Sequence, residues 1–214
     1  MPRTPRVQEE GGVVHVTARG NNRGRILRDQ RDKLLLLDAL ERAVVRFGWR
    51  CHAYCVMGTH YHLLLQTPEP NLSSGMHWLN LRFARRHNRR HGRTGHVFER
   101  RFHSERVDSE RHFLAAARYI VRNPVRAGLC DHPSQWPWSS YRATAGERHA
   151  PDFLTTAGIL ELLGPTAASA RAAYATWAAG EDDRTGTWYV PGTGGVAGRH
   201  LASPAAAAMP GRAR

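Results

Sequence analysis

Apolar residues recur at helical spacing in three segments of the chain. The first segment lies between Asp29, which can cap a helix, and Gly48, which can end one. The second begins at Asn71 and the third at Ser109, and both residues are favourable N-caps. Because a residue before proline avoids the helical region, Pro124 predicts that the third helix ends at about residue 123.

Between these helices lie apolar or alternating runs of strand length, over residues 13–17, 49–57, 61–67 and about 104–107. Gly58-Thr59 makes a short turn that would join the middle two as a hairpin. The order β-α-β-β-α-β-α predicts an α+β fold. We expect a split-βαβ antiparallel sheet with its helices on one face.

The pattern changes after the third helix. We expect the main domain to cover residues 1–145 and to end with an aromatic segment, Trp136-Pro137-Trp138-Ser139-Ser140-Tyr141. Residues 146–180 predict a helical appendage, with short helices at about 154–163 and 166–179. After Gly180 the chain is rich in Gly, Pro, Ala and Arg and has no periodicity, so we expect 181–214 to be a disordered tail.

The net charge indicates the class of partner. Lys and Arg number 31 against 18 Asp and Glu, a formal charge of +13, which favours a polyanion and above all nucleic acid. An acidic membrane surface is the alternative, but no basic amphipathic helix without a core-facing role stands out. No apolar run approaches the roughly 18 residues of a membrane span. The N-terminus lacks the apolar region of a signal peptide, and Cys51, Cys55 and Cys130 form no CxxC pair. We therefore expect a cytoplasmic protein with no membrane partner.

The positive charge is concentrated in an arginine-rich stretch in which Glu99 is the single acidic residue. Its members are Arg82, Arg85, Arg86, Arg89, Arg90, Arg93, Arg100 and Arg101. A solvated helix face usually mixes both signs of charge, so this stretch favours a track for a phosphate backbone. A smaller cluster, Arg19, Asn21, Asn22 and Arg23, follows the first strand and is either a reader of base edges or a plain turn.

Two histidines, His60 and His62, begin the third predicted strand. Residues two apart on a strand point to the same face, so both imidazoles could bind one metal ion. Imidazoles suit Mn²⁺, Zn²⁺ or Ni²⁺, and with an oxygen ligand added also Mg²⁺. Asn123 could supply that oxygen. The alternatives are two hydrogen-bonded histidines at a strand edge and a helix-capping asparagine.

Tyr119 lies four residues before Asn123 on the third helix, so the two share a face. A tyrosine off the centre of a core face is either a packing residue at its rim or a nucleophile. Because a phenol has a pKa near 10, a nucleophilic tyrosine needs help at neutral pH, and a divalent metal that polarises a phosphate supplies it. Together these residues predict DNA cleavage by a tyrosine.

Four segments in order resemble the single-tyrosine transposases of the HUH superfamily, in the branch associated with repetitive extragenic palindromes. They are His15–Arg23, Tyr54–Leu64, Arg118–Leu129 and Trp136–Tyr141. Gly58-Thr59 stands where that family usually has Pro-Asn, and Tyr61 is a second tyrosine close to the histidines.

The resemblance implies a ferredoxin-like fold, with His60, His62 and Asn123 as ligands of Mg²⁺ or Mn²⁺ and Tyr119 as nucleophile. It implies a substrate of single-stranded DNA with a palindromic hairpin, cleaved to a 5′-phosphotyrosine and a free 3′-OH. The turn of Arg19, Asn21, Asn22 and Arg23 would help to read a short guide tetranucleotide. We expect a monomer or homodimer.

Two other functions remain open. One is a domesticated protein that recognises a DNA hairpin without cutting it. The other is an RNA-hairpin binder, since RNA stems and loops also attract arginine-rich helices. Only the RNA binder would use the 2′-hydroxyl.

Overall fold

A computed structural model of the chain describes residues 10–180. The predicted tail over 181–214 lies outside the described residues. Four strands form one antiparallel sheet in the order β2-β3-β1-β4, namely β1 (Gly12–Arg19), β2 (Arg50–Val56), β3 (His60–Thr67) and β4 (His103–Val107). The longer helices are α1 (Gln30–Phe47), α2 (Leu72–His91), α3 (Glu110–Arg126) and α6 (Ala167–Ala179). Shorter ones are α4 (Tyr141–Thr144), α5 (Ala157–Leu160) and the 3-10 turns Asn21–Arg23 and Pro133–Gln135.

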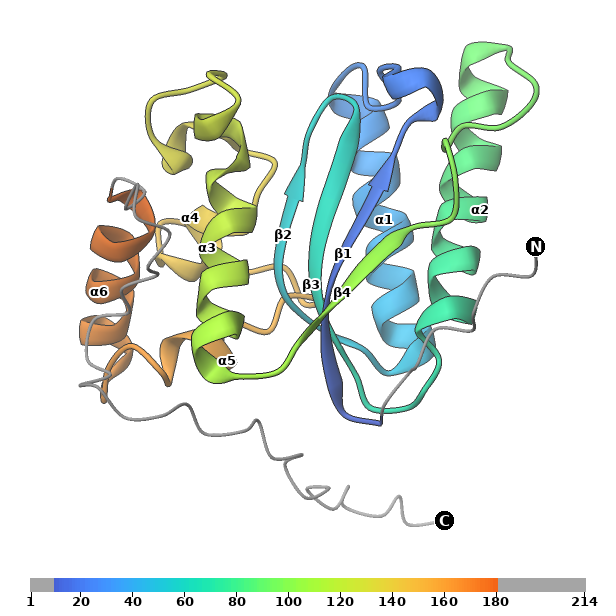
Figure 1. Cartoon of the computed structure of the whole chain (residues 1–214). Helices are drawn as coiled ribbons and strands as arrows, with labels where there is room; N and C mark the ends of the chain where they lie inside the picture. Colours follow the sequence, from blue (N-terminus) through green and yellow to red (C-terminus); the bar gives the residue numbers. More distant parts are fainter. Residues whose placement is uncertain (1–9, 181–214) are drawn as a thin grey trace, which may run out of the picture.

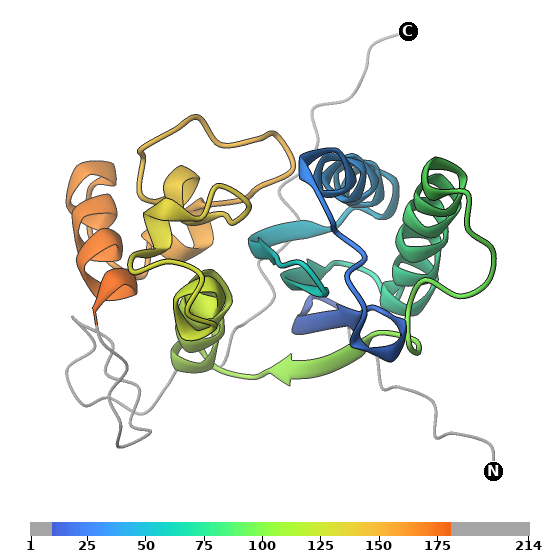
Figure 2. The ribbon, with the colours of Figure 1, turned by 90° about the horizontal axis from the view of Figure 1, so that it is seen from above.

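The α+β class and the antiparallel sheet are confirmed, but the helices cover both faces of the sheet and not one. Two apolar cores result: α1 and α2 pack on one face, and α3 with α6 and the shorter C-terminal helices packs on the other. Figure 1 and Figure 2 show the sheet between the α1–α2 pair and α3. The third helix follows β4, the strand at one edge, and its strongly apolar side fits the face that α1 and α2 leave uncovered.

Strand β3 explains how both cores form. Leu63 and Leu65 belong to the core under α1 and α2, whereas Leu64 belongs to the core under α3. Successive side chains of a strand point to opposite faces, so a strand buried on both sides reads as a continuous apolar run. The sequence Leu63-Leu64-Leu65 is that run.

In strand β2 a bulge between Cys51 and Ala53 shifts the register. As a result Cys51 lies in the core under α1 and α2, while Cys55 lies in the core under α3. Both thiols are free and fully buried. A regular strand would have placed them on one face.

The caps at Asp29 and Ser109 are confirmed, because each side chain accepts from the backbone N–H three residues later. Asn71 precedes α2 as expected, but its side chain makes different bonds. Its Oδ1 accepts from Trp49 Nε1 at 2.6 Å, and its Nδ2 donates to the Phe47 carbonyl at 3.0 Å. Asn71 therefore ties α2 to the end of α1.

The predicted end of α3 at residue 123 is wrong, since the helix continues through Pro124 to Arg126. It stops where Gly128 adopts a left-handed φ of 66°. Gly128 N–H donates to the Val125 carbonyl and Leu129 N–H to the Pro124 carbonyl, which is a Schellman ending. Pro124 removes one hydrogen-bond donor near the end of the helix, but its fixed φ is compatible with a helix.

The aromatic segment covers the free edge of β2. Val56 N–H donates to the Trp138 carbonyl at 2.9 Å, and Trp136 Nε1 donates to the Val56 carbonyl at 3.1 Å. Ser140 N–H donates to the Tyr54 carbonyl at 3.0 Å. Covering an edge in this way prevents it from pairing with another chain.

The appendage is anchored to α3 by two buried arginines. Arg118 Nε donates to the Trp177 carbonyl at 2.9 Å and its Nη2 to the Gly180 carbonyl at 2.8 Å. Arg122 Nη1 donates to the Ala179 carbonyl at 2.7 Å. These guanidinium groups satisfy carbonyls at the C-terminus of α6, where the helix dipole favours positive charge. None of the helices between residues 10 and 180 has the length and apolar run needed to cross a bilayer.

We expect Arg118→Ala to lower the free energy of unfolding by about 2 to 3 kcal/mol, because the buried Trp177 carbonyl would lose its charged donor. Urea denaturation measures the change. Arg111→Ala, an exposed arginine of the same helix, is the control and should change stability little. Equal effects of the two variants would show that Arg118 does not anchor the appendage.

Candidate metal and tyrosine site

The pairing of β1 with β3 brings polar residues together on the α3 face of the sheet. His60 lies opposite Arg19, and His62 lies opposite Thr17. Residues directly opposite in an antiparallel pair point to the same face, and so do residues two apart along a strand. His15, Thr17, His60 and His62 therefore share one face.

His62 is held from one side of its ring. Its Nδ1 lies 3.0 Å from His15 Nε2 and 3.0 Å from Thr17 Oγ1. Its Nε2 is buried and has no hydrogen-bond partner among the described residues. With a proton on Nδ1, the Nε2 atom would carry the lone pair that a metal ion needs. This orphaned atom fits the predicted role of His62 as a ligand.

His60 is arranged in the same sense. Its Nδ1 lies 2.9 Å from Thr59 Oγ1, which leaves Nε2 as the atom to face a ligand. The rings of His60 and His62 have centroids 5.0 Å apart and are nearly perpendicular, at 81°. The structure therefore brings the predicted pair together. In each ring, Nδ1 lies within hydrogen-bond distance of a neighbouring side chain.

Burial keeps these imidazoles neutral. It lowers the pKa of His15 to about 4 and, with a smaller contribution from the positive charge of Arg19, that of His60 to about 4. The pKa of His62 lies well below its usual range, first because of burial and then because His15 and His60 are close. Neutral histidine is the form that binds a metal, so the site needs no deprotonation at neutral pH.

Helix α3 places Tyr119 over this face. The centroid of its ring lies 5.7 Å from that of His15 and 5.7 Å from that of His62, in edge-to-face geometry with both. The Arg126 guanidinium lies 5.0 Å from the ring centroid. Tyr119 is half-buried, so it both packs at the rim of the core and faces the histidines.

Tyr61 points the other way and does not compete with Tyr119. It is fully buried in the core under α1 and α2, and its hydroxyl donates to Asn80 Oδ1 at 2.6 Å. Burial raises the pKa of this phenol far above its ordinary value. The strand alternation that puts His60 and His62 on one face puts Tyr61 on the opposite one.

Asn123 lies one turn after Tyr119. Its Nδ2 donates to the Tyr119 carbonyl at 2.9 Å, so the side chain folds back along the helix and does not cap its end. In this arrangement the carboxamide nitrogen is engaged and the oxygen is the atom left for ligation. The third-ligand role of Asn123 stays a prediction.

The arginine-rich stretch runs along α2 and through the segment after it, and its members divide into two groups. Arg82 and Arg86 pair with Asp38 of α1, and Arg90 pairs with Asp29 and Asp32. These three hold α2 against α1. The exposed members are Arg85, Arg89, Arg93, Arg100 and Arg101.

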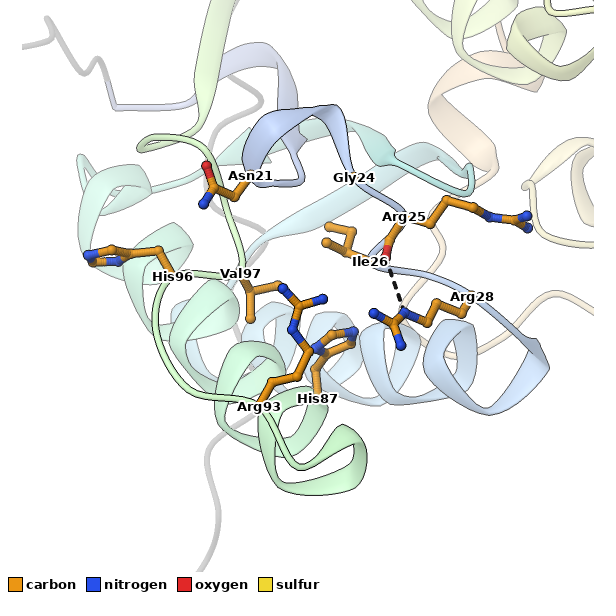
Figure 3. A pocket seen from close by; sticks show the side chains of 9 residues that line it. All are labelled: Asn21, Gly24, Arg25, Ile26, Arg28, His87, Arg93, His96 and Val97. Carbon is orange, nitrogen blue, oxygen red and sulfur yellow. Dashed lines mark hydrogen bonds between the residues drawn. The ribbon is translucent and has the colours of Figure 1, made fainter.

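The turn after β1 is conformationally unusual. Asn22 and Arg23 have φ angles of 51° and 54°, a left-handed region that costs energy for residues other than glycine. Gly20 is required, because a Cβ there would lie 2.4 Å from the Gly24 carbonyl oxygen. Beside the turn, Asn21 lines a pocket of about 260 Å³, shown in Figure 3. The binding role of Arg19, Asn21, Asn22 and Arg23 stays a prediction.

Sequence reasoning missed the roles of His15 and Thr17. The available signal was the alternation of His15, Thr17 and Arg19 along the first strand, which puts three polar side chains on one face. Without the register of β1 against β3, that face could not be matched to His60 and His62. A separate group of three potential ligands, Asp32, His87 and His91, was missed as well.

Comparisons with known proteins give the family and the fold of the chain. The family described as "Transposase IS200 like" matches residues 10–123. A protein of Haemophilus influenzae named as a REP-associated tyrosine transposase is 26% identical over 114 residues, which cover 48% of this chain and 65% of that protein's length. A solved structure of a REP-associated tyrosine transposase bound to a REP hairpin aligns with a TM-score of 0.60. That alignment covers 72% of this chain and 92% of the solved chain at 20% identity, and the likeness is one of fold.

The buried histidines make stability depend on pH. Folded His15 and His60 titrate near pH 4, whereas unfolded histidine titrates near 6.5, so between these values the unfolded chain binds more protons. The contribution of these two histidines to the free energy of unfolding is therefore complete above pH 6.5 and is lost as the pH falls toward 4.

We expect His15→Gln to show a smaller fall in thermal midpoint than the unaltered chain between about pH 7 and pH 5. His77→Gln, at an exposed position, should follow the unaltered chain. A slope shared by all three proteins would show that His15 does not couple folding to pH.

Proposed function

The chain belongs to the IS200-like transposase family, and on that premise we propose that it is a metal-dependent endonuclease and strand transferase with Tyr119 as its nucleophile. The family assignment confirms the resemblance expected from the sequence. The observation that carries the proposal is the position of Tyr119 over His62, whose Nε2 is buried without a partner among the described residues. The proposed substrate is single-stranded DNA with a palindromic hairpin.

In the proposed reaction the Tyr119 hydroxyl oxygen attacks a backbone phosphorus. The bond from phosphorus to the 3′ oxygen breaks, the phenolic proton passes to solvent, and the leaving oxygen takes up a proton to become a 3′-OH. The product is a 5′-phosphotyrosine, which keeps the phosphodiester energy for rejoining. A Mg²⁺ or Mn²⁺ ion on His60, His62 and Asn123 would make the phosphorus more electrophilic and stabilise charge in the transition state.

The chain's own residues prepare this step by fixing geometry. His15 and Thr17 orient the His62 ring, and Thr59 orients the His60 ring. Ring contacts with His15 and His62, together with Arg126, fix the direction of the Tyr119 ring. A nucleophile on a helix, over ligands on a rigid sheet, suits a reaction in which positioning contributes much of the rate.

Two surfaces would bind the DNA. The exposed arginines Arg85, Arg89, Arg93, Arg100 and Arg101 would track the phosphate backbone. The turn at Arg19–Arg23 lies next to the site, because Arg19 is opposite His60 in the pairing of β1 with β3. The turn would therefore read bases close to the cleaved bond. The alternative function, a DNA-hairpin binder without cleavage, would use the same two surfaces.

We expect Tyr119→Phe to abolish a covalent protein–DNA adduct while hairpin binding stays near that of the unaltered chain, because the substitution removes one oxygen and little packing. The measurement is a denaturing gel with labelled single-stranded hairpin DNA and Mn²⁺, with a chelator control. Tyr61→Phe is the matched control and should still form the adduct, since Tyr61 faces the opposite core.

If the Tyr119→Phe protein still cleaved the DNA, Tyr119 would be excluded as the nucleophile. If the unaltered chain bound hairpins tightly but formed no adduct on any of them, the non-cleaving binder would be favoured. Equal binding of RNA and DNA hairpins would favour the RNA-binding alternative.

Replacing Arg85 and Arg89 by serine should flatten the dependence of DNA binding on salt. The log–log slope should become shallower by about 0.7 for each phosphate that an arginine no longer neutralises. The matched control is the double variant Arg82→Ser/Arg86→Ser, with the same change of charge on the same helix. Because Arg82 and Arg86 pair with Asp38, that variant should lower stability and change the slope less. If the salt dependence became equally shallow in both double variants, the DNA would contact both sides of α2, contrary to this prediction.

A further inference from the structure

A second group of potential metal ligands lies far from Tyr119 in the fold. Asp32 is in the first turn of α1, and His87 and His91 are near the end of α2. These helices cover the face of the sheet opposite to α3, so the group is separate from His60 and His62. No step of the proposed DNA cleavage uses it.

The three side chains converge. His87 and His91 are one helical turn apart, with ring centroids 4.5 Å from each other. His91 Nε2 lies 2.9 Å and 3.1 Å from the two Asp32 carboxylate oxygens. One ligand atom from each of the three residues lies within 4.8 Å of the others. A small adjustment of side chains would bring two nitrogens and an oxygen around one ion.

His87 is the anomaly that points to a ligand. Its side chain is 1% exposed, yet neither Nδ1 nor Nε2 has a hydrogen-bond partner among the described residues. Buried polar atoms are satisfied in most proteins, and an unsatisfied one calls for an explanation such as an ion. His87 also lines the pocket of Figure 3, which provides a route from solvent.

The local charges allow a cation despite the nearby arginine. Arg90 pairs with both Asp29 and Asp32, so two carboxylates face one guanidinium. With neutral imidazoles, the group of Asp29, Asp32 and Arg90 carries one net negative charge, while Arg25, Arg28 and Arg93 of the adjoining pocket add positive charge around it. Burial lowers the pKa of His87, and although burial alone would raise that of Asp32, hydrogen bonds from His91 and Arg90 hold the Asp32 pKa below its ordinary value. The Asp32 carboxylate is further fixed by the Arg28 N–H at 3.0 Å.

We propose that Asp32, His87 and His91 bind a transition-metal ion of the zinc class that joins the start of α1 to the end of α2. Two imidazoles and one carboxylate are a usual ligand set for Zn²⁺, whereas Mg²⁺ prefers oxygen ligands. The ion would take the lone pair of a His87 nitrogen and replace the hydrogen between His91 and Asp32. The competing arrangement is an Asp32–His91–Arg90 ion-pair network that holds no metal.

The test measures Zn²⁺ binding to the full chain by equilibrium dialysis and metal analysis. His60→Ala/His62→Ala serves as the background, so that the candidate catalytic site does not contribute. We expect this background to retain about one zinc per chain, and His87→Gln or His91→Gln added to it to lose that zinc. His77→Gln, an exposed histidine of the same helix, is the control and should leave zinc binding unchanged.

A background protein that binds no zinc would overturn the proposal, as would zinc that survives both His87→Gln and His91→Gln. If His87→Gln does not fold, the comparison between His91→Gln and His77→Gln decides, because His91 is partly exposed. Bound zinc should also raise the thermal midpoint of the background protein and leave that of the His91→Gln protein unchanged. Equal shifts in the two proteins would contradict the assignment.

Discussion

The candidate site depends on one constraint, the register of β1 against β3. Thr17 lies opposite His62 and Arg19 opposite His60, and strand alternation then fixes which side chains share a face. A shift of one residue would turn His60 and His62 toward α1 and α2 and Tyr61 toward α3. The register is held because β3 is buried on both sides, so that Leu63 and Leu65 fill one core and Leu64 the other.

The two-sided burial of the sheet also gives the site its chemical properties. A histidine pair on an exposed sheet would be solvated and would titrate near its ordinary pKa. Here α3 covers the face, lowers the pKa of the imidazoles by burial and brings Tyr119 within 5.7 Å of the His62 ring. The helix that completes the second core is therefore the same element that carries the proposed nucleophile.

Much of this could be predicted from the sequence, because the signals are local. The strand alternation that groups His60 with His62, the helical spacing of Tyr119 and Asn123, and the caps at Asp29 and Ser109 each depend on residues within a few positions of one another. The roles of His15 and Thr17 depend on pairing with a strand that begins at His60, far along the chain. Local periodicity does not give that register.

Two of the errors have the same origin, whereas the end of α3 depends on two competing local signals. Pro124 predicted a helix end from a local rule, but the Schellman ending at Gly128 set the boundary. The run of arginines predicted one positive surface along α2. In the structure, Arg82, Arg86 and Arg90 pair with acidic residues of α1 that are distant in the sequence. The helices on the second face of the sheet were not predicted, because the apolar sequence of β3 is compatible with helices on one face or on both.

The central claim is that the histidine face under α3 binds a metal ion next to Tyr119. Anomalous scattering from a crystal grown with Mn²⁺ tests it most directly. We predict a peak within coordination distance of the Nε2 atoms of both His60 and His62, on the side of Tyr119. No peak there in a crystal whose histidine face is accessible, or a peak only at Asp32, His87 and His91, would contradict the claim.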